Sequence, residues 1–237
     1  MAGHHSQHNA NSPPASPPAI PATAPRLPRA AWRDIDAATA HGLAPQVARA
    51  VSHAAHTTDS DHATALLAWA KHVAPRSTTV REALGIHAYR TGDYHTAARE
   101  LHTYRRISGR QDHNHLLADS LRATGHPHRI RELVEAMGDD IDHQRRLEAK
   151  IVHAAALADT GDTLRAREIL ERAGGQPHTA TPTHLRLWYL AAQLSLQLHD
   201  PHHASELLQA ITTIQPDYLD AADQLANLHQ HTDSDTH

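Results

Sequence analysis

The chain has 237 residues, of which 40% are hydrophobic and only 3% aromatic, and its formal net charge at pH 7 is −4. The absence of cysteine excludes disulfides and thiolate metal sites and favours a reducing compartment, so we expect a cytoplasmic protein. The balance of charge provides no overall basic field for nucleic acid. No apolar run is long enough for a signal peptide or a membrane span.

Histidine is unusually frequent, with 25 residues. Since the unperturbed imidazole pKa is about 6.5, roughly three quarters of these side chains would be charged at pH 6, and the net charge would move to about +15. The sequence leaves open whether they sense pH or fill exposed positions without a specific role. Pairs such as His113 and His115 lack evident further ligands, and there is no HExxH pattern, so we expect no metal site.

The first 28 residues are rich in Pro, Ala, Ser and Asn. Such a segment buries too little apolar surface to offset the entropy of ordering, which predicts a disordered leader over 1–28. The following segment, 29–41, carries Trp32 and Ile35 on one helical face. It is expected to form an N-terminal capping helix that covers the first repeat.

Five short turn signals then recur along the chain, and the successive gaps between them are 34, 33, 36 and 38 residues. A period in this range is typical of helical hairpins stacked into a solenoid. Glycine ends a helix in the left-handed conformation, and aspartate caps the next helix by accepting hydrogen bonds from its first turn. The signals are Thr58-Asp59, Gly92-Asp93, Gly125-His126, Gly161-Asp162 and His199-Asp200.

Apolar residues at three- and four-residue steps between these signals predict five hairpins, beginning near residue 44. A final helix over about 217–230, carrying Leu219, is expected to close the stack, and the polar residues 231–237 predict a flexible tail. The predicted fold is therefore all-α, a right-handed α-solenoid of about five hairpins with a capping helix at each end, over residues 29–230.

At these positions the chain resembles the tetratricopeptide repeat family. The family motif has Trp, Leu-Gly and Tyr in the first helix of a hairpin, and Ala, an aromatic residue and a late Pro in the second. The second hairpin matches best, and the third and fourth keep the turn glycine and the apolar spacing. The residues that carry the resemblance are Pro75, Leu84, Gly85, Gly92, Ala97, Leu101, Gly125, Gly161, Trp188, Ala204 and Pro216.

A longer run, from VREALGIHAYRTGDY to LLADSLRATGHPHR, is similar to a group of actinobacterial tetratricopeptide proteins. This resemblance implies a cytoplasmic adaptor without catalytic residues. The sequence agrees, since it contains no Gly-rich phosphate loop and no GxSxG elbow. We therefore predict a non-catalytic scaffold with no cofactor.

In a solenoid of this type the first helix of each hairpin lines a concave groove, which is the expected site for a protein or peptide partner. Tyr89, Arg90 and Arg122 are predicted to anchor an extended or helical peptide of acidic character, because Tyr and Arg are frequent interface anchors. The alternative is a solvated helix face with incidental ion pairs. The full set of predicted groove residues is Glu82, Ile86, Tyr89, Arg90, His115, Asp119, Arg122, Tyr189, Gln193 and Gln197.

One dense basic segment contains Arg99, Arg105, Arg106 and Arg110. Cations near the end of a helix are favoured by the helix dipole, and no stacking aromatic residues alternate with these arginines. We therefore do not expect nucleic acid to be the main partner. A regulatory repeat subunit of an RNA-associated or transcriptional complex remains the alternative function.

Overall fold

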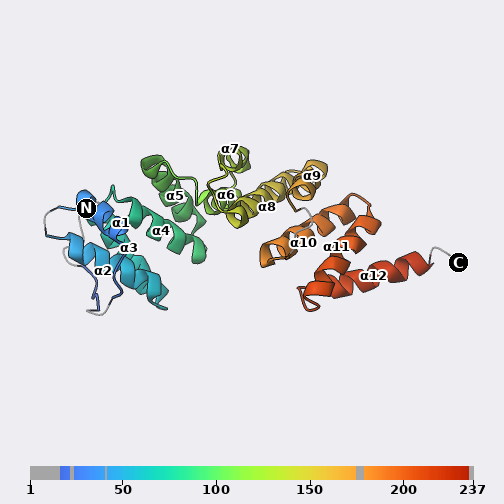
Figure 1. The fold of residues 1–237 in the computed structure, drawn as a ribbon, viewed down its shortest axis with the longest axis horizontal. Helices are drawn as coiled ribbons and strands as arrows, with labels where there is room; N and C mark the ends of the chain where they lie inside the picture. Colours follow the sequence, from blue (N-terminus) through green and yellow to red (C-terminus); the bar gives the residue numbers. More distant parts are fainter. Residues whose placement is uncertain (1–16, 22–23, 41, 175–178, 235–237) are drawn as a thin grey trace, which may run out of the picture. The chain divides into compact units, whose positions relative to one another are not determined.

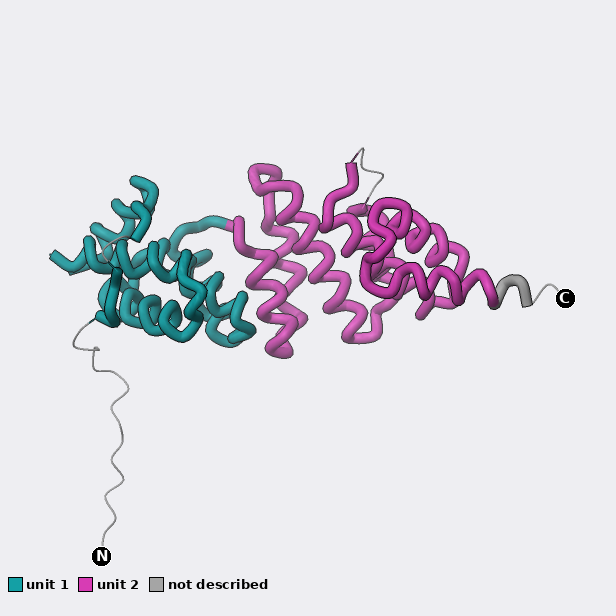
Figure 2. The backbone as a smooth tube through the Cα atoms, turned by 90° about the horizontal axis from the view of Figure 1, so that it is seen from below, with its two compact units in different colours: residues 1–110 teal, residues 111–237 magenta. Residues whose placement is uncertain are grey.

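The computed structural model describes residues 17–21, 24–40, 42–174 and 179–234, with side chains as far as residue 230. Within these ranges the chain forms twelve α-helices, one 3-10 helix and no strand (Figure 1), which confirms the predicted all-α fold. Every described helix is either too short or too polar to cross a bilayer. The chain divides into two compact units, 1–110 and 111–237 (Figure 2).

Unit 1 consists of a first helix followed by two helical hairpins. In the hairpins α2 packs with α3 and α4 packs with α5, while α1 packs against α2 and α4, as expected for a capping helix. Apolar residues such as Ile35, Val47 and Leu66 form its core. The helices are α1 (Arg29–Ala38), α2 (Ala44–His56), α3 (Ser60–Val73), α4 (Thr78–Arg90) and α5 (Tyr94–Ser108).

The polypeptide that precedes α1 lies on α2. The Ser52 hydroxyl donates a hydrogen bond to the carbonyl oxygen of Pro25 at 2.5 Å, and Ile20 and Leu27 pack against the core of unit 1. Packing therefore begins before residue 29, where the predicted leader was expected to end. Residues 1–16 and 22–23 of that leader lie outside the described residues.

Helix α1 also caps α4, through Asp34. This carboxylate accepts hydrogen bonds from the Ser77 hydroxyl, from the backbone and hydroxyl of Thr78 and from the backbone of Thr79, at 2.5 to 3.1 Å. Burial alone would raise the pKa of Asp34, but these bonds hold it below its ordinary value. They join α1 to a helix more than 40 residues further along the chain.

A charged residue that the sequence analysis did not single out lies in the core of unit 1. Glu100, on α5, is fully buried, and its carboxylate accepts from Lys71 Nζ at 2.6 Å, from Arg99 Nε at 2.9 Å and from Arg81. Burial alone would raise the pKa of Glu100, and the three cationic donors lower it instead. The network ties α3, α4 and α5 together.

Unit 2 contains three hairpins and a closing helix. In these hairpins α6 packs with α7, α8 with α9 and α10 with α11, while α12 packs on α11. The short α7 follows a 3-10 turn that begins at Pro127. The helices are α6 (Asn114–Ala123), α7 (Ile130–Glu135), α8 (His143–Asp159), α9 (Thr163–Gly174), α10 (Pro182–Gln197), α11 (Pro201–Ile214) and α12 (Ala221–Ser234).

The closing helix differs from its prediction at both ends. The chain turns after Pro216, where the Tyr218 and Ala221 amides donate to the carbonyls of Gln215 and Tyr218, so α12 begins only at Ala221. Leu219 is consequently 71% exposed with φ +47°, and its predicted place in the helix is wrong. The helix runs on to Ser234, into the predicted tail, and residues 235–237 lie outside the described residues.

The recurring turns have the predicted geometry. Gly92, Gly125 and Gly161 have φ between +77° and +89°, and the amide of the next residue donates back to a carbonyl in the last turn of the preceding helix. This bond is the mark of a Schellman ending. In the fifth signal His199 takes the glycine position with φ +58°. Asp59, Asp93 and Asp200 each cap the next helix, accepting from a backbone amide at 2.9 to 3.1 Å.

Candidate partner-binding groove

The first helices of the three hairpins in unit 2 lie next to one another in the order α6, α8, α10 (Figure 1). Together they form a groove of about 420 Å³. Four predicted partner-binding residues line it: Arg122 on α6, and Tyr189, Gln193 and Gln197 on α10. The helical phase read from the sequence therefore places these side chains on one surface.

The floor of the groove is apolar. It consists of Ile151, Ala155 and Ala158 on α8 together with Leu190 and Leu194 on α10. Ile151 and Leu194 are buried and belong to the core, whereas Ala155, Ala158 and Leu190 are half-buried and reach the groove surface. The small alanine side chains leave the space above α8 open. Such a floor suits an apolar side chain of a partner.

The positive charge of Arg122 is matched within the unit. Its guanidinium contacts Asp119 Oδ1 at 3.2 Å and Asp159 Oδ2 at 3.0 Å. Burial alone would lower the pKa of Arg122, but the two carboxylates raise it. A second arginine of the groove, Arg186, pairs with Glu148 at 2.6 Å. The electrostatic argument for an acidic peptide at Arg122 is therefore weak, because both arginines already have carboxylate partners.

Tyr189 and Gln193 connect the groove to the closing helix. The Tyr189 hydroxyl donates to Asp220 Oδ1 at 2.5 Å, which raises the pKa of Tyr189, and Gln193 Nε2 donates to Gln224 Oε1 at 2.7 Å. These bonds hold the two side chains in place along α10. Gln197 is exposed and makes no hydrogen bond to a described residue, so its amide is available to a partner.

Two of the four predicted residues of unit 1 line a different, smaller hollow, and Glu82 and Tyr89 do not. Ile86 and Arg90 on α4 contribute to a space of about 230 Å³ with Ala54, Ala55 and Leu67. Tyr89 packs its ring edge against Tyr94, with ring centroids 5.7 Å apart. Exposed Arg90 forms no ion pair with a described residue. It stays a predicted anchor for an acidic group.

His115, on α6, is a half-buried member of the predicted set. Burial, followed by the charges of His113 and Arg145, lowers the pKa of His115 to about 4. Its side chain is therefore neutral at pH 7 and adds no cation to the predicted set. The rings of His53 and His62 meet across the first hairpin, with centroids 5.5 Å apart.

Comparison with known proteins agrees with this geometry. The family described as the tetratricopeptide repeat protein 21 ARM repeat matches residues 85–237. The chain belongs to this family. The tetratricopeptide repeat assignment thus covers all of unit 2 and, in unit 1, all of α5 and the part of α4 from Gly85 to Arg90. Repeat-signature residues from Gly85 to Pro216 fall inside the matched range.

Among solved structures, the repeat chain is similar to "YrrB: a TPR protein with an unusual peptide-binding site", with a TM-score of 0.54 and 18% identity. The similarity covers 74% of this chain and 89% of that one. At this identity the likeness establishes the fold alone. No curated protein sequence matches the chain.

Proposed function

We propose that the chain is a non-catalytic scaffold that holds a peptide segment of a protein partner in the groove formed by α6, α8 and α10. One observation carries this proposal: a groove across three consecutive first helices has an open apolar floor on α8 and α10 and is rimmed by polar side chains. The peptide-binding site named for the YrrB protein, which has the same fold, supports it. The absence of cysteine favours a reducing compartment such as the cytoplasm for this interaction.

The chemistry of the groove defines the peptide. Ala155 and Ala158 leave room for one apolar side chain, and the exposed amide of Gln197 can pair with a peptide backbone group. The compensated charges of Arg122 and Arg186 give no strong preference for acidic residues. The expected ligand is therefore an extended or helical segment with an aliphatic or aromatic anchor and little net charge.

The test is to fill the groove. Random peptides displayed on phage are selected against the full chain, and the affinity of selected peptides is measured by fluorescence anisotropy. Ala155→Trp occupies the space above α8 and should weaken binding by about tenfold or more. The matched control is Ala226→Trp, at an exposed position of α12, which should leave the affinity unchanged. Circular dichroism checks that both variants keep their helices.

Peptides that bind wild type and Ala155→Trp equally well would show that the groove is not the site. The same conclusion follows if no peptide with an apolar anchor is enriched against the wild-type chain. Gln197→Ala refines the result, since it removes the free amide and should weaken binding by a few fold only.

A further inference from the structure

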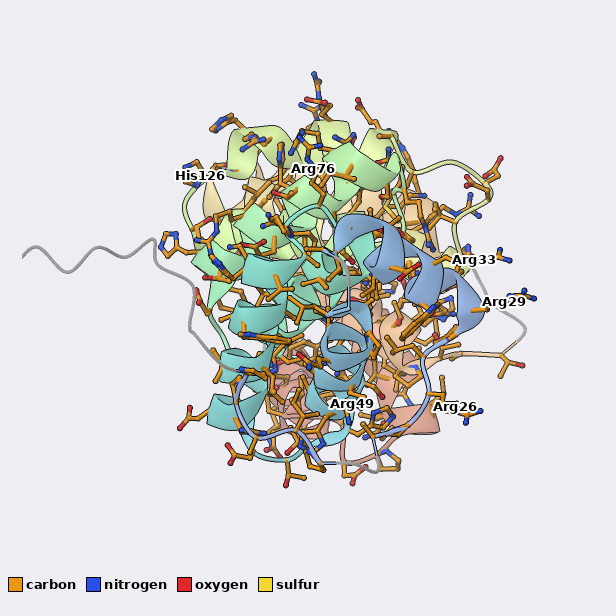
Figure 3. All side chains as sticks on the ribbon, turned by 90° about the vertical axis from the view of Figure 1, so that its left-hand side faces the viewer. Arg26, Arg29, Arg33, Arg49, Arg76 and His126 are labelled. Atoms are coloured by element: carbon orange, nitrogen blue, oxygen red, sulfur yellow. The ribbon has the colours of Figure 1, made fainter. Side chains whose placement is uncertain are left out.

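A second hollow lies in unit 1, where the polypeptide before α1 crosses α2. It has a volume of about 530 Å³ and is lined by residues 24–27, by Arg29 and Trp32 of α1 and by Pro45, Ala48 and Arg49 of α2. The sequence analysis singled out none of its arginines. Figure 3 shows Arg26, Arg29 and Arg33 projecting outward along one edge of the molecule, with Arg49 on the same face.

The arginines around this hollow have no charge partners among the residues that the structure describes. Arg26, Arg29, Arg33 and Arg49 are all exposed, and none forms an ion pair with a described residue. The described residues that line the hollow include no acid. Of the two acids on α1, Asp34 is fully engaged by the hydrogen bonds that cap α4. The other, Asp36, does not line the hollow, so the positive charge stays uncompensated.

The wall of the hollow is apolar and anchored. Trp32 is 38% exposed although it was expected to face the core with Ile35, and Pro25, Leu27 and Pro45 lie around it. The buried Ser52 hydroxyl holds the carbonyl of Pro25, which secures residues 24–27 over α2. The volume is that of a preformed pocket for one or two large side chains. Exposed Trp and Arg together are typical of binding anchors.

The ends of two helices add to the positive potential, although they do not carry the argument. The residues before α1 and α2 are Pro28 and Leu43, and neither supplies a side-chain hydrogen bond to the first turn. Neither first turn contains an acid, and Arg29 opens α1. A cation at the positive end of a helix raises the local potential instead of matching it. A bound anion would lower this positive potential.

We propose that this hollow binds an acidic peptide segment of a partner protein, which places an apolar side chain against Trp32 and its carboxylates at Arg26, Arg29 and Arg49. Arginine suits this ligand because its planar group binds a carboxylate through two parallel hydrogen bonds. A protein ligand is favoured over a nucleic-acid strand because the lining is largely apolar. A nucleic-acid strand needs an extended track of cations with stacking rings.

This site is independent of the groove in unit 2. The probe is a fluorescein-labelled peptide EDELFEDE, which surrounds an apolar pair with acids, and its neutral counterpart is QNQLFQNQ. The full chain should bind the acidic peptide, with an affinity that falls as salt rises, and should bind the neutral peptide at least about tenfold more weakly. Trp32→Ala should weaken binding to the acidic peptide by several fold, since it removes the apolar wall.

The double variant R29E/R49E should lose at least about tenfold in affinity. Its fold should be kept, because Glu in place of Arg29 matches the dipole of α1 better than the native residue. The matched control is Arg76→Glu, which changes another exposed arginine of unit 1 that lies away from the hollow (Figure 3). This control should bind as wild type does.

Equal binding of the acidic peptide to wild type and to the double variant would overturn the proposal, as would equal binding of the neutral peptide or no binding at all. A labelled 12-nucleotide single-stranded RNA that binds more tightly than the peptide at physiological salt would assign the hollow to nucleic acid and also overturn it. Ala155→Trp should leave acidic-peptide binding unchanged, so the two sites succeed or fail separately.

Discussion

Replacing Glu100 by Gln should lower the free energy of unfolding of unit 1 by about 3 kcal/mol. The side chain keeps its shape but loses its charge in a site where the carboxylate accepts from three cationic donors. Gln retains one acceptor oxygen and turns an NH₂ group toward at least one of those cations. Lys71, Arg81 and Arg99 then all lose the counter-charge that the carboxylate supplied.

The structure sets the magnitude. Hydrogen bonds to charged groups contribute about 1.5–3 kcal/mol each, and removal of one partner from a buried ion pair costs about 3–5 kcal/mol. The side chain of Glu100 is fully buried, but those of Lys71 and Arg99 are 30% and 57% exposed, so water can solvate these two cations in the variant. Because water solvates these cations, the expected loss of unfolding free energy lies at the lower end of the range of about 3–5 kcal/mol.

The effect should also depend on pH. Because the folded-state pKa of Glu100 is lowered, its stabilisation is present above the ordinary glutamate pKa of about 4.3 and is lost as the pH falls below that value. Gln does not titrate. The difference in stability between wild type and variant should therefore be constant from pH 7 to pH 5 and shrink toward pH 3.

Urea unfolding followed by circular dichroism measures the loss, and hydrogen exchange assigns it to α4 and α5, since two compact units need not unfold together. The control is Glu168→Gln, which breaks an exposed pair with Arg172 and should cost no more than about 0.5 kcal/mol. A loss below about 1 kcal/mol for the Glu100 variant, or a difference that does not shrink at low pH, would refute the reasoning.

Four further substitutions test the turns, the close contact and the cap. His199→Gly should stabilise unit 2 by about 0.5–1 kcal/mol, because glycine adopts the positive φ without strain, and Gly161→His should lose a similar amount in thermal unfolding. Gly85→Val should cost about 1–3 kcal/mol, because a Cβ there would lie 2.8 Å from the Leu101 side chain; the loss should be smaller when measured in a Leu101→Ala background. Asp34→Ala should cost about 1–2 kcal/mol, with faster hydrogen exchange in the first turn of α4.

Part of the candidate groove could be predicted because helical phase is a local property. Tyr189 and Gln193 share a face of α10 because they are four residues apart, and Arg122 lies in the same groove because α6, α8 and α10 pack in order. The ion pairing of Arg122 could not be predicted from helical phase. Its charge is matched by Asp159, which lies 37 residues away on another helix. The sequence contains both residues but not the distance between them.

The sequence contains a signal for the arginine-lined hollow of unit 1 that our sequence analysis did not use. The segment RLPRAAWR contains three arginines and a tryptophan without an acid, which is unusual in a chain of slight negative charge. The hollow also needs Arg49 of α2 beside this segment. Residues 24–27 lie over α2 because the Ser52 hydroxyl donates a hydrogen bond to the Pro25 carbonyl. That contact joins positions 27 residues apart, so no local pattern reveals it.

By itself, the sequence determined the helices, their pairing into hairpins and the turns between them. Each of these depends on a few neighbouring residues, such as Gly92 in its left-handed conformation and Asp93 at the start of the next helix. Tertiary structure alone decided which charges are matched, which rings stay exposed and where hollows open. Those outcomes depend on side chains brought together from distant helices, because burial and charge pairing act through space while turn and helix propensities act along the chain.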